Sequence, residues 1–374
     1  MPYRNKENAC CVRLQLHPEN LLCYTENNGP VAQWIEHQSS ELSVGGSIPS
    51  RVTSFCLPHC TAWWFFYAEN TQTRQSGWYN PTIPLKYRKN AMEPIVRWPH
   101  GYRATVSLAF DIDGPSGDAM LDDSLPHNLR YFTEGSYGPY RGVPRLLDLL
   151  AQYALTATFF IPTWVVEHWP VLCERIVAEG HEVGYHGHRH EVFFDLTLDQ
   201  QRAVMEHSKA VFQRVLGITP VGFRTPSGDW SDETATLLRR FGVLYSSSMR
   251  GDDRPYFHPA VDGTHGLVEL PARWDMDDYT ALAYFEDPAF PTGLDRISDY
   301  RVVARNWIAE FEGYYRDGLF WTTILHPKVS CKPGRLRILA ALFTAIRSHD
   351  DVWVAKAGDV AQWWIDSQAH EVQA

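Results

Sequence analysis

The sequence predicts an α/β fold in which parallel strands form a sheet or a barrel, and it places that fold in residues 92–374. Two observations support this prediction. From Thr105 onward, short apolar stretches rich in β-branched residues alternate with amphipathic stretches of helical length. Repeated βα units of this kind build a parallel sheet or a closed barrel, and reactive polar side chains follow several of the predicted strands.

The predicted elements follow one another in the alternating order that this fold requires. After the first strand, Pro144 is suited to the first turn of a helix. The apolar stripe of that helix consists of Val143, Leu146, Leu147 and Leu150. Further helices are expected over 169–180, 197–216, 231–241, 299–316 and 334–348. Strands are expected over 105–110, 156–161, 181–186, 221–224, 243–248, 267–270, 319–325 and 352–356.

Residues 1–91 differ from the rest of the chain. They show no sustained helical or strand period, and their Asn, Gln, Ser and Pro residues are scattered. The segment 29–51 is similar to peptides produced when a transfer-RNA gene is translated by mistake, and Met92 opens a natural domain start. We therefore expect 1–91 to be a mis-assigned or non-globular extension. The competing interpretation is a genuine extension that serves as an oligomerisation arm.

Composition narrows the class of protein. A hydrophobic fraction of 44% with 14 Trp is ample for a packed core, and a net charge of −10 argues against a nucleic acid or an anionic membrane as partner. No run approaches the ~18 apolar residues that a spanning helix needs. The first residues lack the apolar segment of a signal peptide. The chain has seven cysteines, and an odd number without a secretory signal is typical of cysteines that stay reduced. We therefore expect a cytoplasmic protein.

Two carboxylates follow the first predicted strand. Asp111 and Asp113 are two residues apart, so both point the same way at a strand end, and Gly114-Pro115 then turns the chain. One carboxylate can hold a metal ion while the other accepts a proton from water. A solvated turn would have a similar composition, so this motif alone is a weak signal.

Three histidines within five residues follow the predicted strand at 181–186. His186 and His190 would share one face if the segment turned helically, as in other two-histidine metal sites. Together with Asp113 they form a three-ligand set with open positions, which predicts one divalent ion, zinc being the best match. His188 would face elsewhere, and we expect it to support the ligands or to contact the substrate.

Two further motifs end predicted strands. Arg224 can clamp a carboxylate with two hydrogen bonds, although a surface ion pair fits the sequence equally well. His326 could serve as a general acid, because histidine titrates near working pH; a capped strand end is the alternative. Trp230, at the end of the Arg224 motif, and Trp274 are expected to contact the substrate.

Four motifs together resemble a known family. FDIDGP, HGHRH, RTPSG and ILHP occur in the order and spacing of the polysaccharide deacetylase, NodB-homology or carbohydrate esterase family four motifs. The resemblance covers roughly residues 100–366. It is stronger for the peptidoglycan-deacetylase-like branch, which includes allantoinase-like and cyclic-imide-hydrolase-like enzymes; YGPYRGVPRLLDLL, YSSSMRGDDRPYF and ELPARWDMDDY carry it. The resemblance implies an irregular (β/α) barrel and leaves a homo-oligomer open.

The resemblance also implies individual roles. Asp111 corresponds to the catalytic base, Arg224 to the arginine that orients it and His326 to the general acid. The metal ligands would be Asp113, His186 and His190. Asp-Ile-Asp departs from the usual Asp-Asp, and the usual fourth motif has no clear counterpart. Trp274, Asp275 or Asp277 could substitute for it.

We therefore expect a metal-dependent hydrolase of carbon–nitrogen bonds other than peptide bonds. Its substrate would be a small cytosolic cyclic amide, imide or ureide, because Trp274, Met276 and Tyr279 would narrow the pocket around a flat ring. The first alternative is a polysaccharide or peptidoglycan N-deacetylase, whose amino-sugar substrate needs an open groove. The second is a catalytically inactive carbohydrate-binding relative, against which the intact motif residues argue.

Overall fold

The computed structural model divides the chain into two units, Met1–Lys89 and Asn90–Ala374. The structure describes residues 12–16, 21–24, 54–55, 96–116, 129–259, 266–283 and 297–371. In the first unit it describes a small antiparallel sheet in the order β2-β1-β3, formed by β1 (Val12–Leu16), β2 (Leu21–Tyr24) and β3 (Ser54–Phe55). The expectation of a non-globular segment at 1–91 falls mostly outside the described residues.

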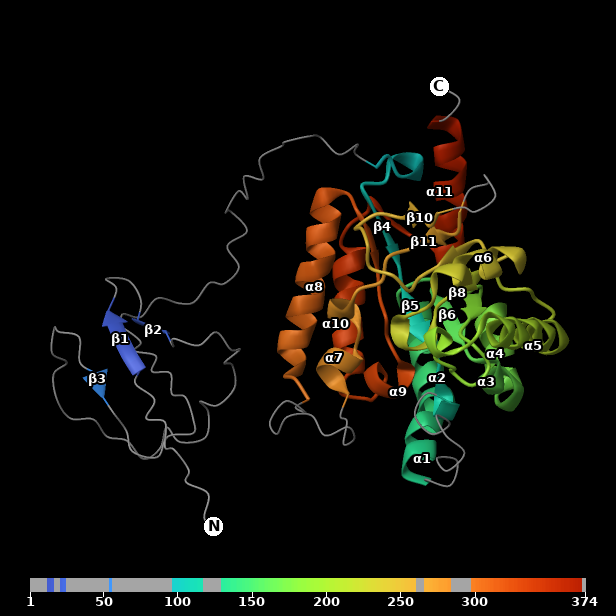
Figure 1. The fold of residues 1–374 in the computed structure, drawn as a ribbon, viewed down its shortest axis with the longest axis horizontal. Helices are drawn as coiled ribbons and strands as arrows, with labels where there is room; N and C mark the ends of the chain where they lie inside the picture. The colour runs from blue at the N-terminus through green and yellow to red at the C-terminus, as the bar shows by residue number, and fades with distance from the viewer. Residues whose placement is uncertain are drawn as a thin grey trace, which may run out of the picture. The chain divides into compact units, whose positions relative to one another are not determined.

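The second unit is built on two sheets of short, mostly parallel strands (Figure 1). The larger sheet has the order β10-β11-β9-β8-β7-β6-β5, and within it β10 and β11 pair antiparallel. Its strands are β5 (Ala109–Asp111), β6 (Thr158–Ile161), β7 (Glu182–Tyr185), β8 (Gly222–Phe223), β9 (Tyr245–Ser246), β10 (Tyr256–Phe257) and β11 (Val268–Glu269). The smaller sheet, in the order β12-β4-β13, consists of β4 (Ala104–Ser107), β12 (Phe320–Thr322) and β13 (Val352–Val354).

The stretch expected as one strand at 105–110 is split between the two sheets. β4 belongs to the smaller sheet and β5 to the larger one, with the fully buried Leu108 between them. The sheets meet where Phe110 forms a parallel bridge with Leu325, and Asp111 N donates to the Leu325 carbonyl at 2.9 Å. Through these contacts, the chain that follows β12 of the smaller sheet pairs with β5 of the larger sheet. The α/β class with parallel strands and the irregular barrel are confirmed.

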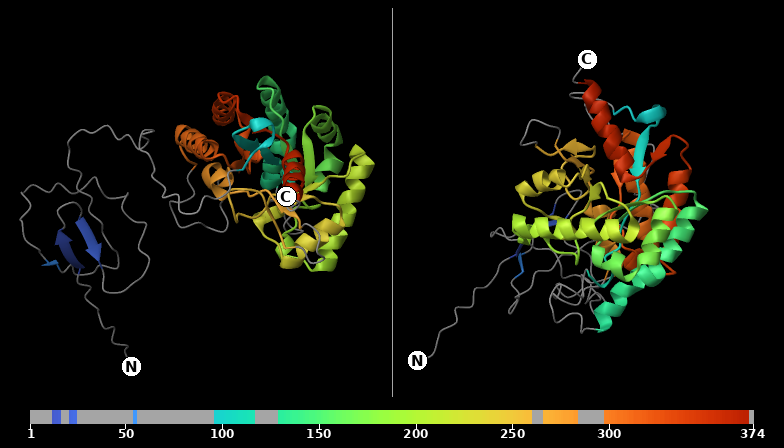
Figure 2. Two further views of the ribbon diagram at one scale, coloured as in Figure 1. Left: turned by 90° about the horizontal axis from the view of Figure 1, so that it is seen from above. Right: turned by 90° about the vertical axis from the view of Figure 1, so that its right-hand side faces the viewer.

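Helices lie around the strands in all views of the second unit (Figure 2). The six helices expected from the sequence are confirmed as α2 (Val143–Gln152), α4 (Pro170–Ala178), α5 (Leu198–Leu216), α6 (Asp232–Arg240), α8 (Tyr300–Asp317) and α10 (Leu336–Arg347). The described residues also contain helices that the sequence analysis did not predict: α1 (Leu129–Tyr137), α3 (Thr163–His168), α7 (Tyr279–Leu282), α9 (Pro327–Ser330) and α11 (Ala357–Glu371). Among the described residues, no helix is both long and apolar enough to cross a membrane.

The α5 helix shows how local sequence sets these boundaries. The Thr197 side chain accepts from the backbone N–H of Gln200, and the Gln200 side chain accepts in return from the backbone N–H of Thr197, which forms a capping box. Gly217 ends the helix with a positive φ of 67°. The inner face buries Met205, Val211 and Phe212, and such burial stabilises the fold by about 1.5–3 kcal/mol per large side chain.

Candidate active site

Reactive side chains gather where parallel strands end. Asp111 ends β5, His186 follows β7, Arg224 follows β8 and His326 lies beyond β12. All four line one cavity of about 330 Å³, together with Asp113 and His190. The loops after the carboxyl ends of strands form the catalytic face in (β/α) barrels, so the location agrees with the chemistry.

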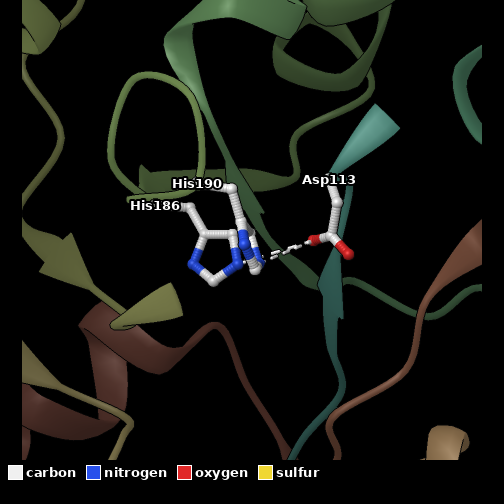
Figure 3. Close-up of side chains that lie close together, drawn as sticks. All are labelled: Asp113, His186 and His190. Atoms are coloured by element: carbon white, nitrogen blue, oxygen red, sulfur yellow. Dashed lines mark ion pairs between the residues drawn. The ribbon is translucent and has the colours of Figure 1, made fainter. Parts of the chain in front are cut away.

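Asp113, His186 and His190 form a compact trio (Figure 3). Asp113 Oδ1 lies 3.5 Å from His186 Nε2 and 3.8 Å from His190 Nε2. The two imidazole rings stand nearly perpendicular, with centroids 4.9 Å apart and planes at 78°. Asp113 and His186 are buried at 3% and 2% exposure. The structure thus brings together the three residues that the sequence predicted as metal ligands.

A loop, and not the helical turn considered from the sequence, brings the two histidines together. Gly187 and His190 adopt positive φ values of 73° and 62°, and a Cβ atom at Gly187 would come within 2.6 Å of the Glu191 carboxylate. Glu191 accepts hydrogen bonds from the backbone N–H groups of His188 and Arg189, at 2.8 and 3.0 Å. This carboxylate closes the loop, and the sequence analysis did not identify it.

The trio fits a divalent cation. His186 Nδ1 donates to the Arg224 carbonyl at 2.8 Å, and Nε2 is the ring nitrogen that faces Asp113. A hydrogen bond from the other ring nitrogen to a carbonyl is the usual support of a metal-binding histidine. His186 Nε2 and Asp113 Oδ1 are both buried and have no hydrogen-bond partner in the described structure. Leaving such polar atoms buried and unsatisfied is costly, and a metal ion between them removes that cost.

Lys328 completes the surroundings of Asp113. Its ammonium lies 3.2 Å from Asp113 Oδ2, and its side chain is 5% exposed. Burial alone would raise the pKa of Asp113, but Lys328, His326 and His190 outweigh this effect and hold it well below its usual value. Asp113 is therefore a carboxylate whose Oδ1 faces the histidines. The sequence analysis did not identify Lys328.

Arg224 holds Asp111 in a buried pair, by one hydrogen bond and not by the two considered from the sequence. Arg224 Nη1 donates to Asp111 Oδ1 at 2.8 Å, and both side chains are 3% exposed. The guanidinium also donates to the Ser247 carbonyl and hydroxyl, both at 2.9 Å, and to the Thr323 carbonyl at 3.1 Å. These bonds fix one oxygen of Asp111, and the other, Oδ2, lies 4.0 Å from His326 Nε2.

His326 is paired with a residue that the sequence analysis did not identify, Asp278. His326 Nδ1 lies 2.7 Å from Asp278 Oδ1, and the His326 backbone N–H donates to Asp278 Oδ2 at 2.9 Å. Ser330 Oγ donates to the same oxygen, and Asp278 is fully buried. Burial by itself lowers the pKa of His326, but Asp113, Asp278 and Asp277 outweigh it and raise the pKa to about 10. A raised pKa favours the protonated imidazole, which is the form that can donate a proton.

Aromatic and polar side chains complete the cavity lining. Trp274 is 65% exposed, and the Arg250 guanidinium lies 4.7 Å from the centre of its ring. The Tyr279 ring stands edge-on to His326, with centroids 4.5 Å apart. Burial, partly offset by His326, raises the pKa of Asp277 to about 6. Trp274, Tyr279 and Asp277 all line the cavity, whereas Met276, expected there as well, is buried in the core at 1% exposure.

The structure does not bring two of the expected substrate contacts to the described cavity lining. The His188 ring instead contacts Thr163 Oγ1 at 3.0 Å and packs against His207, because the loop turns it away from the trio. Trp230 is 9% exposed and stacks on Phe223, with ring centroids 6.0 Å apart. His188 therefore contacts residues of α3 and α5, and Trp230 contacts a residue of β8.

Comparisons with known proteins agree with this geometry. Residues 136–246 match the family model described as polysaccharide deacetylase. A peptidoglycan deacetylase of Helicobacter pylori is 30% identical over 276 residues, which cover 67% of this chain and 92% of the relative. A solved structure of a suspected polysaccharide deacetylase from Mycobacterium smegmatis is 32% identical, with a TM-score of 0.69 over 73% of this chain and 94% of that one. Puue allantoinase, at 21% identity and a TM-score of 0.61 over 76% and 97%, shares the fold.

A barrel that gathers an Asp-His-His trio, an arginine-held carboxylate and a carboxylate-paired histidine defines a metal-dependent hydrolase. The chain belongs to the polysaccharide deacetylase family, as its motifs indicated. It is thus an enzyme that hydrolyses carbon–nitrogen bonds other than peptide bonds, and a divalent metal ion takes part in the chemistry of its family.

Proposed function

We propose that the chain removes the acetyl group from an N-acetylated amino sugar by hydrolysing its amide bond. The observation that carries this proposal is the position of Asp111 and His326 beside the Asp113, His186 and His190 trio in one cavity. A carbohydrate-type substrate is the one that the family implies. The similarity to the H. pylori peptidoglycan deacetylase supports the same substrate class.

The comparisons support this alternative better than the cyclic amide that the sequence analysis ranked first. The H. pylori and M. smegmatis relatives, which are 30% and 32% identical over most of their own length, are described as deacetylases of peptidoglycan or polysaccharide. The allantoinase structure, at 21% identity, shows a shared fold alone. One observation still favours a compact ring as second candidate: the cavity of about 330 Å³ is near the lower end of the ~300–1,000 Å³ typical of small-molecule sites.

The side chains divide the chemistry among them. A divalent ion held by Asp113, His186 and His190 would polarise the amide carbonyl and acidify the attacking water; zinc is the ion we propose for this ligand set. Asp111 accepts the proton of the water on Oδ2, because Arg224 holds its Oδ1. His326, protonated and oriented by Asp278, donates a proton to the departing nitrogen.

A side-by-side hydrolysis assay tests this function. Metal-loaded enzyme would be incubated with N-acetylglucosamine oligomers and, separately, with cyclic imides and ureides, with Asp111→Asn protein as the blank. We expect free amine and acetate from the oligomers. Ring opening without any deacetylation would reverse the ranking of the two substrate classes, and inactivity on both, with metal bound, would contradict the proposal.

A further inference from the structure

A second cluster of residues that could hold a metal ion includes His188, which belongs to the same loop as His186 and His190. Glu167 of α3, His188 of the loop and His207 of α5 each offer a ligand atom, and these atoms lie within 4.8 Å of one another. The cluster is separate from the described cavity lining, which contains none of the three. Nothing in the proposed deacetylation uses it.

The geometry of this cluster resembles that of the catalytic trio. The His188 and His207 rings have centroids 4.3 Å apart and planes at 70°, against 4.9 Å and 78° for His186 and His190. In both places a carboxylate stands beside two nearly perpendicular imidazoles. The Thr163 hydroxyl lies 3.0 Å from His188 Nδ1 and orients that ring, so Nε2 remains available to a cation.

We propose that Glu167, His188 and His207 form a second, accessory site for a divalent ion of the zinc class. Two imidazoles and one carboxylate are ligands that zinc, nickel and copper accept, whereas magnesium and calcium prefer oxygen ligands alone. Binding is weaker than in the cavity, because Arg214 already pairs with Glu167 at 2.6 Å. The Arg214 side chain is 60% exposed, so displacing it costs little.

An ion at this site would restrict the movement of the loop that carries His186 and His190. The loop is already attached to α3, since the Thr163 N–H donates to the Gly187 carbonyl at 3.1 Å and the Trp164 N–H donates to the His188 carbonyl at 3.0 Å. The accessory ion would connect three parts of the chain, because Glu167 lies on α3, His188 in the loop and His207 on α5. Zinc in excess of one equivalent is therefore expected to stiffen the surroundings of His186 and His190.

Zinc titration of the full chain tests the proposal, with calorimetry for affinity and elemental analysis for stoichiometry. We expect two equivalents in the wild type, the second of them weaker. His207→Ala and Glu167→Gln should each abolish the weaker binding and keep the stronger. His207 is exposed on a helix, where alanine is well tolerated.

Two further variants make the result specific. Glu206→Gln removes an exposed glutamate beside His207 that is outside the cluster, and it should retain both equivalents. His186→Ala should lose the stronger binding and keep the weaker, which separates the accessory site from the catalytic one. A wild type that binds one equivalent at saturating zinc, or a second equivalent that survives both His207→Ala and Glu167→Gln, would overturn the proposal.

Discussion

Arg224 holds one carboxylate oxygen of Asp111, which leaves Oδ2 to accept the proton of water in the proposed mechanism. Replacing Asp111 by Asn keeps the size of the side chain and removes its ability to take a proton. Arg224 retains its bonds to Ser247 and Thr323, so the fold should survive. We expect turnover to fall about 10²–10⁴-fold with metal content unchanged.

Single-turnover or steady-state assays with elemental analysis of the same samples measure both quantities. Asp148→Asn, which alters an exposed carboxylate of α2, is the control and should retain full activity. Near wild-type turnover in Asp111→Asn protein would move the role of base to another group.

Asp278 sets the protonation of His326 by contact. Asp113 and Asp278 both raise the pKa of the imidazole, so Asp278→Asn lowers that pKa, and the proposed general acid loses its proton at a lower pH. The alkaline limb of the kcat–pH profile should therefore move to lower pH, by about 1–3 units for the loss of one opposite charge at this distance.

The control for this shift is Asp275→Asn, which alters a nearby carboxylate that pairs with Arg273. Its profile should match that of the wild type. An alkaline limb that stays in place in Asp278→Asn protein would show that another group governs the proton donation.

The residues differ in how far the sequence could predict them. Local pattern and motif spacing identify the residues that lie at or just after strand ends: Asp111, Asp113, His186 and His190. Asp278 contacts His326 across 48 residues, and nothing in the local composition marks that pairing. Lys328 and Glu191 are supporting groups defined by tertiary contacts, which a motif of reactive side chains does not contain.

At the scale of single elements, capping explains where α5 begins. Thr197→Ala removes the side-chain oxygen that accepts from the Gln200 backbone N–H, and loss of such a cap costs about 1 kcal/mol of unfolding free energy. Chemical denaturation should show this loss, with kcat unchanged because α5 lines no part of the described cavity.

Ser231→Ala is the matched comparison, because Ser231 precedes α6 without a side-chain capping bond. That variant should be destabilised much less than Thr197→Ala. Equal stability losses in the two proteins would mean that the capping box of α5 contributes nothing measurable.

Element boundaries also show what sequence periodicity omits. Residues 105–110 have the composition of one strand, yet the chain leaves one sheet after β4 and enters the other at β5. At this point Phe110 forms a bridge with Leu325, which is distant in sequence. Alternating hydrophobicity identifies an extended segment, but the sheet that it joins is decided by its distant partners.

At the scale of the whole molecule, the candidate metal site links the ends of two strands. Asp113 follows β5 and the two histidines follow β7, so an ion between them stabilises the native barrel and not the unfolded chain. Free ion at 100 times its Kd would add about 2.7 kcal/mol of stability. Treatment with a chelator should therefore lower the Tm, and added zinc should restore it.

His186→Ala protein is the control for chelation. Its Tm should respond much less to the chelator, because the stronger binding is already lost. A wild-type Tm that does not change while elemental analysis shows complete metal removal would mean that the ion contributes nothing to the stability of the fold.

The last prediction concerns residues 1–91, which we propose are dispensable for catalysis. Every described residue of the cavity and of both hydrophobic core clusters lies at Val96 or beyond, and the division into two units falls between Lys89 and Asn90. Protein that starts at Met92 should have the same Tm and the same kcat and KM as the full chain, measured side by side. A Tm lower by several degrees would indicate that the extension stabilises the barrel, and a higher KM at equal Tm would indicate that it contributes to substrate binding.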